Sequence, residues 1–133
     1  MTIVYFIIAL GILIFIHEFG HFIMAKRAGI FVEAFSLGFG PRLFGIKKGD
    51  TDYRISLIPF GGYVKMRGES PDDSTAQDPK SFMAKSVWSR FKVIVWGPLM
   101  NVVLAMIFMP IVSMLGREEP VFLREQPIVN TIK

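Results

Sequence analysis

The chain has 133 residues, of which 52% are hydrophobic, with 15 Lys+Arg, 11 Asp+Glu and no Cys. This length allows one domain at most, the composition excludes a disordered chain, and the lack of cysteine excludes a disulfide scaffold and thiol catalysis. The net charge of +4 is compatible with nucleic acid or with anionic lipid. Because the mean hydropathy of +0.47 is too high for an ordinary soluble domain, we expect a lipid bilayer as the partner and no nucleic acid.

The first apolar segment, residues 3–25, is predicted to form a transmembrane helix. Its 23 residues would form a helix of roughly 34 Å, enough to cross a hydrocarbon core of about 30 Å. Its only ionisable residues are His17, Glu18 and His21. A signal peptide is the alternative, but no Lys or Arg precedes the segment and no small-x-small cleavage site follows it.

Residues 34–66 carry the pattern of a small antiparallel β-sheet or a pair of β-hairpins. Four short β-prone runs, at 34–39, 42–47, 53–58 and 62–66, are separated by glycine and proline turn signals. The runs are too apolar for a free cytoplasmic loop. Two arrangements stay open: the hairpins dip into the bilayer with their backbone groups paired, or they form a small cytoplasmic subdomain packed on itself.

The segment that follows is first polar and then amphipathic. Residues 69–78 are acidic and contain a proline, which predicts a mobile loop. Asp78 suits a helix N-cap and Pro79 suits the first helical position. Because apolar and basic residues then occupy opposite arcs, residues 79–92 are predicted to form an amphipathic helix at the membrane interface.

A second apolar run, residues 93–115, contains no charge and is predicted to form the second transmembrane helix of a membrane α-helical fold. Transmembrane helices tolerate prolines such as Pro98 and Pro110. Segment 26–92 holds 12 Lys+Arg, whereas three follow the second run. The positive-inside rule therefore places the N-terminus and the tail, residues 116–133, outside and segment 26–92 on the cytoplasmic side.

The five residues from His17 to His21 match the pattern H-E-x-x-H. Positions i and i+4 share a helix face, so both imidazoles can bind one zinc ion while Glu18 accepts a proton from metal-bound water. Catalytic zinc typically has three protein ligands, and we find no convincing third one in this chain. The alternative is that these groups pair with polar groups of another helix. His17 lies roughly 21 Å along the helix from Ile3, which places the site towards the cytoplasmic end.

The second apolar run contains a polar feature of its own. Gly97 permits close approach of another helix, and Asn101 places an amide within the bilayer, where it should face protein. Read in isolation, these two residues fit an interhelical packing motif as well as a functional role.

Taken together, these motifs resemble the site-2 proteases, a family of intramembrane zinc metalloproteases, and in particular the bacterial regulator of sigma-E protease type. The similarity rests on His17–His21, on residues 36–41 and 58–66, and on residues 97–101, which resemble the start of the family's second span. It covers nearly the whole chain as an N-terminal part.

The resemblance implies a role for each of these motifs. His17 and His21 would bind Zn²⁺, and Glu18 would be the general base. The hairpin around Gly61, Gly62 and Tyr63 would present substrate in extended form by strand addition, and Asn101 would contact substrate. The expected protein is a multi-pass protein of the bacterial inner membrane, and its substrate is a single-pass membrane protein such as an anti-sigma factor.

The chain departs from the family in one respect. A carboxylate ligand, an aspartate in an L-D-G motif, comes from a later span in the family and is absent here. We therefore expect a fragment whose last residues, 127–133, lead into a PDZ domain and which by itself holds zinc weakly and cleaves poorly. The alternative function is a non-catalytic membrane binding module that captures a transmembrane partner by strand addition.

Overall fold

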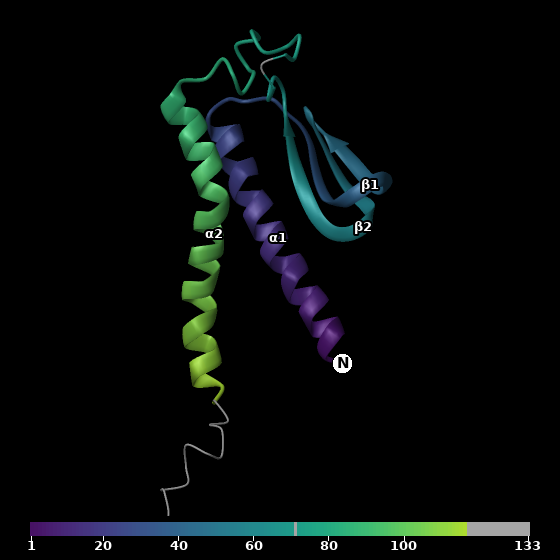
Figure 1. Ribbon diagram of the computed structural model, residues 1–133, viewed down its shortest axis with the longest axis vertical. Helices are drawn as coiled ribbons and strands as arrows, with labels where there is room; N and C mark the ends of the chain where they lie inside the picture. Colours follow the sequence, from purple (N-terminus) through teal and green to yellow (C-terminus); the bar gives the residue numbers. More distant parts are fainter. Residues whose placement is uncertain (71, 117–133) are drawn as a thin grey trace, which may run out of the picture.

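The computed structural model describes residues 1–70 and 72–116. The order of elements is α1 (Thr2–Arg27), β1 (Val32–Lys48), β2 (Thr51–Met66) and α2 (Val87–Met114). The helices run side by side in opposite directions, and they diverge towards the N-terminus of α1 (Figure 1). The β-sheet lies against the C-terminal half of α1, on the side away from α2 (Figure 1).

Both predicted apolar helices are confirmed as helices, each slightly longer than its apolar run. Both are long and apolar enough to cross a membrane. In α1 only Gly20 and Ala25 are buried, and in α2 only Val93 and Gly97. Most of their apolar side chains are exposed within the described residues, so the two helices present a large apolar surface.

The predicted antiparallel sheet is also present, as one hairpin of two long strands rather than as four short ones. A tight turn at residues 49–50 joins the strands, and Lys48 is paired with Thr51. Residues 34–37 of β1 lie between two parts of β2, because Ala34 is paired with both Asp52 and Lys65. The two strands therefore bend back on themselves, and the bends fall near the prolines and glycines that separated the predicted runs.

The core lies where the two helices meet the base of the sheet, the end that contains Val32 and Met66. Its buried members are Ala25, Ile30, Val32, Phe35, Val64, Met66 and Val93. Aromatic residues of α1 extend this core over the sheet: the Phe15 and Phe22 rings each pack on Phe35, at centroid distances of 5.8 and 5.2 Å. This packing fixes the sheet on α1.

The predicted amphipathic helix over residues 79–92 is wrong in its first half. Residues 79–86 form bends and turns, and α2 begins at Val87, where the Ser86 hydroxyl accepts a hydrogen bond from the Ser89 N–H at 3.3 Å. The Phe82 N–H donates to the Arg67 carbonyl and the Lys80 carbonyl accepts from Phe31. These tertiary hydrogen bonds replace the helical ones that local propensity favours.

Residues 69–78 were predicted to be a mobile loop, and those described form turns. The Asp73 carboxylate accepts hydrogen bonds from the backbone N–H and the hydroxyl of Thr75, at 2.9 and 2.7 Å. Most of the predicted tail, residues 117–133, lies outside the described residues, as does the expected start of a PDZ domain.

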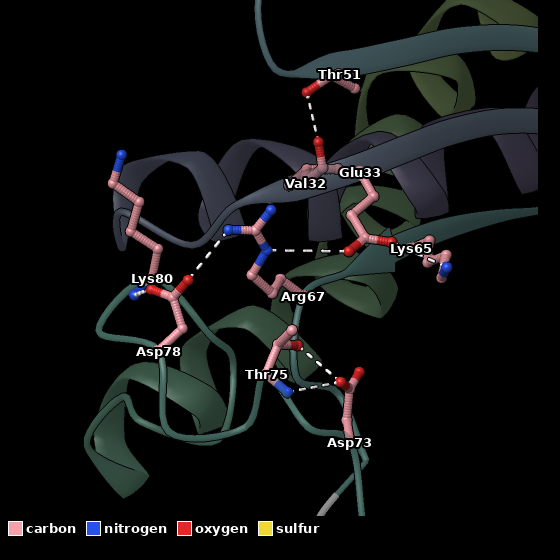
Figure 2. A network of polar contacts seen from close by, with 9 residues as sticks. All are labelled: Val32, Glu33, Thr51, Lys65, Arg67, Asp73, Thr75, Asp78 and Lys80. Atoms are coloured by element: carbon pink, nitrogen blue, oxygen red, sulfur yellow. Dashed lines mark hydrogen bonds and ion pairs between the residues drawn. The ribbon is translucent and has the colours of Figure 1, made fainter.

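A polar network ties this segment to the base of the sheet (Figure 2). Arg67 lies at its centre: one guanidinium nitrogen donates to Asp78 Oδ2 at 3.0 Å, and another is 4.0 Å from Glu33 Oε1. The same guanidinium lies 3.9 Å from the centre of the Phe31 ring. Hydrogen bonds from the Lys80 N–H and from Arg67 hold the pKa of Asp78 below its ordinary value.

This network predicts a pH dependence at acid pH. The lowered pKa of Asp78 means that its contribution is present above the ordinary value of 3.8 and is lost as pH falls through the folded-state pKa. We expect the Lys80 amide resonance to titrate with a midpoint below 3.8 and Arg67→Gln to move that midpoint upward. Asp73, whose pKa is lowered by its hydrogen bonds from Thr75, is the internal control, and Arg67→Gln should not change its titration midpoint. Equal responses of both carboxylates would contradict the assignment.

Candidate metal centre

The two motif histidines converge on one point between α1 and α2. His17 and His21 are one turn apart on α1, and their Nε2 atoms are 3.1 Å apart. Two nitrogens bound to one tetrahedral zinc ion at 2.0–2.1 Å would be about 3.3 Å apart. The imidazoles therefore already have nearly the spacing that a shared zinc ion requires.

Helix α2 orients the His21 ring. The Nδ1–H of His21 donates to the Val93 carbonyl at 2.7 Å, which leaves the Nε2 lone pair directed at the shared point. A backbone acceptor behind the metal-binding nitrogen is the usual outer-shell arrangement for a histidine ligand. Val93 could not be recognised from the sequence, because its carbonyl, not its side chain, makes this contact.

Gly97 makes room for that contact. A Cβ atom built on Gly97 would overlap the His21 ring, and one built on Gly20 would lie 2.5 Å from the Trp96 carbonyl oxygen. The sequence predicted close helix approach at Gly97, and the structure shows which residue approaches. Val93, Gly97 and Asn101 form a stripe at intervals of four along α2, opposite His17 and His21.

Glu18 lies beside the histidines and faces a cavity. The cavity has a volume of about 460 Å³, and its lining includes Glu18, His21, Gly62, Tyr63 and Glu69. A Cβ atom built on Gly62 would lie 3.2 Å from Glu18 Cγ, so the strand passes close to the glutamate because it carries no side chain there. The structure thus brings the predicted base to the predicted hairpin.

The remaining predicted site residues occupy three different places. Tyr63 lines the cavity, and its ring stacks on Phe39 at 6.3 Å between centroids. Gly61 lies outside the cavity lining; with a φ of +122°, its backbone passes over the Phe39 ring, where a side chain would overlap it. Asn101 Nδ2 is 3.4 Å from His17 Nδ1 and lies behind the histidine, not in the cavity.

A third ligand is not found alongside the histidines. Within residues 1–70 and 72–116, no group of three His, Cys, Asp or Glu side chains could hold a metal ion. The paired imidazoles fit two positions of a zinc coordination sphere, and catalytic zinc sites typically take three protein ligands. Among the described residues, the structure thus brings two candidate ligands together, as the sequence motif predicts.

Paired imidazoles, an adjacent glutamate and an open cavity are features expected of a metallopeptidase site. Comparison with known proteins then identifies the family. The profile of peptidase family M50 matches residues 5–132. The chain therefore belongs to peptidase family M50, the site-2 protease family, as its motifs predicted.

Several curated bacterial proteins are similar to this chain. A protein of Chlamydia pneumoniae is 48% identical over 87% of the chain, and one of Clostridium acetobutylicum is 47% identical over 85%; both bear the name "Putative zinc metalloprotease". The zinc metalloprotease RasP of Bacillus licheniformis is 51% identical over 53% of the chain. The chain spans 21%, 32% and 17% of the lengths of these three relatives.

The Gly97 contact predicts a specific effect of one methyl group. Gly97→Ala should displace the His21 ring, lower the free energy of unfolding by about 1–3 kcal/mol and reduce the bound zinc. Gly11→Ala is the matched control, since apart from the adjoining residues and backbone of its own helix no atom lies within 4 Å of a Cβ built on Gly11. Thermal unfolding in detergent and elemental analysis of bound zinc would measure both effects. Unchanged zinc content in Gly97→Ala would show that the glycine is not needed for the site.

Proposed function

We propose that this chain forms the N-terminal part of the catalytic core of a zinc-dependent endopeptidase that cleaves transmembrane segments of membrane proteins. The observation that carries the proposal is the 3.1 Å approach of His17 Nε2 to His21 Nε2, with Glu18 beside them facing the cavity. Membership of peptidase family M50 supports the same reaction class. The third ligand would come from outside the described residues.

The side chains at this site fit the separate roles of metal ligand and general base that are typical of metallopeptidases. His17 and His21 would hold the zinc ion, which lowers the pKa of a bound water to about 7. Glu18 would accept a proton as the water attacks the peptide carbonyl and would then deliver a proton to the leaving amine. The Val93 carbonyl holds His21 in the tautomer needed for binding.

The sheet supports a mode of substrate binding. Residues 62–65 of β2 pair with residues 34–37 of β1, and Gly62, Tyr63, Val64 and Met66 line the cavity with Glu18. Within the described residues, no further strand pairs with this part of β2. A substrate segment in extended form could therefore add to this strand, with its peptide groups beside the glutamate.

The structure also favours a depth for the sheet. If α1 spans the membrane, the end of the sheet at Pro59 and Gly61 lies at bilayer depth, because these two residues line one cavity together with four α1 residues between Ile8 and Phe15. Large apolar side chains of the sheet are 50–75% exposed: Leu43, Phe44, Ile46, Leu57 and Phe60. Hydrogen-bonded strands are the form in which such a surface can enter lipid. Of the two arrangements left open by the sequence, we propose that the sheet dips into the bilayer.

The function predicts the effect of one isosteric change. Glu18→Gln should reduce cleavage of a single-pass membrane substrate by about 10²- to 10⁴-fold, because the amide cannot accept the proton. Bound zinc should stay at the wild-type level, since His17 and His21 are untouched. Cleavage would be followed on immunoblots of membranes and zinc by elemental analysis. Full cleavage by the variant would refute Glu18 as the base.

A non-catalytic binding module is the second candidate, favoured by the absence of a third ligand within the described residues. It predicts that a zinc chelator and Glu18→Gln leave partner capture unchanged and that no product forms under any condition. A cleavage product that disappears with chelator and returns with added zinc would exclude it.

The membrane placement is tested by cysteine labelling, since the chain has no cysteine of its own. With an impermeant maleimide, Thr2→Cys should react from the outside and Lys48→Cys only from the cytoplasmic side of a bacterial inner membrane. Phe60→Cys should react from neither side, because lipid covers it, and should react in detergent. Labelling of Phe60→Cys in intact membranes would show that the sheet lies in water.

A further inference from the structure

Asn101 lies beside His17, and the proposed mechanism gives it no role. Its Nδ2 lies 3.4 Å from the Nδ1 atom of His17, on the opposite side of the ring from the Nε2 that faces His21. Its Oδ1 is buried and has no hydrogen-bond partner among the described residues. A buried acceptor without a partner costs roughly 1–3 kcal/mol, so its persistence at a site needs a reason.

The chemistry of the histidine supplies this reason. A neutral histidine that binds a metal through Nε2 carries its proton on Nδ1, and that N–H needs an acceptor. The side-chain NH₂ of Asn101 cannot accept, but its Oδ1 can. A half-turn of the amide exchanges the two atoms and brings Oδ1 to Nδ1.

The arrangement matches that of the other histidine. His21 donates its Nδ1–H to the Val93 carbonyl, a backbone acceptor that no side-chain substitution removes. Asn101 lies two helical turns further along the same stripe of α2 and offers its side chain to the corresponding atom of His17. The Nδ1 atoms of both imidazoles are thus contacted by α2.

We propose that Asn101 is a positioning residue for zinc binding: its Oδ1 accepts the Nδ1–H of His17 and holds the Nε2 of that ring ready to bind the metal. This inference rests on the proposed function in so far as His17 is a zinc ligand. It differs from a substrate contact, because Asn101 is not part of the cavity lining beside Glu18.

The test compares two substitutions of nearly the same shape. Asn101→Leu removes the acceptor and should weaken zinc binding by about 10- to 100-fold, the usual effect of losing an outer-shell partner. Asn101→Asp keeps an acceptor but no donor and should bind zinc at least as tightly as the wild type. Affinities would be measured by competition with a zinc-chelating dye, using the complete protein in detergent. Ser113→Ala is the control, since this hydroxyl of α2 donates only to the Met109 carbonyl.

A spectroscopic measurement on the wild-type protein complements the affinities, and it does not require any variant to fold. In the zinc-loaded wild type, ¹⁵N NMR of labelled histidine should show the proton of His17 on Nδ1. Zinc bound through Nδ1 instead would overturn the inference.

The outcomes separate the inference from the proposed function. Wild-type protein that binds no zinc would overturn both. Zinc binding that is equally tight in the wild type and in Asn101→Leu would overturn only the inference. Equal losses in the Leu and Asp variants would also overturn it, because they would show that the amide acts as a donor. A changed KM with unchanged zinc affinity would assign Asn101 to substrate instead.

Discussion

The close contact of α1 with α2 at Gly20 and Gly97 is the constraint on which the rest of the site depends. Two helices can bring backbone and imidazole this close only where side chains are absent, because a single Cβ at either glycine would collide with the opposite helix. This contact places the Val93 carbonyl within 2.7 Å of His21 Nδ1. The orientation of the His21 imidazole on α1 is therefore set by α2.

The sheet depends on the same helix from its other side. Phe15 and Phe22 hold β1 against α1 through Phe35, and Gly62 brings β2 to Glu18. One helix thus carries the two histidines towards α2 and the glutamate towards the cavity beside the strand. The i, i+4 spacing of the histidines and the intervening position of Glu18 make this double use of a single helix possible.

Local sequence rules succeeded where the surroundings agree with them and failed where tertiary contacts compete. The apolar runs became helices because every backbone group in such a run is satisfied within the helix itself. Asp78 accepts a hydrogen bond from the Lys80 N–H at 2.8 Å, as a cap would, yet no helix follows. The backbone there bonds to Phe31 and Arg67 instead, and neither partner is visible in a local pattern.

The sequence by itself determined the two long apolar helices, the antiparallel character of the region between them and the pairing of His17 with His21 on one helix face. Each of these follows from hydropathy, turn residues or spacing within one short segment. Only the tertiary structure decided that β1 lies between two parts of β2 and that Gly62 adjoins Glu18. It also decided that Asn101 lies beside the Nδ1 atom of His17 and that the Val93 carbonyl accepts a hydrogen bond from Nδ1 of His21. These contacts join residues up to 84 positions apart, and one partner is a backbone atom, so the residue types alone could not predict them.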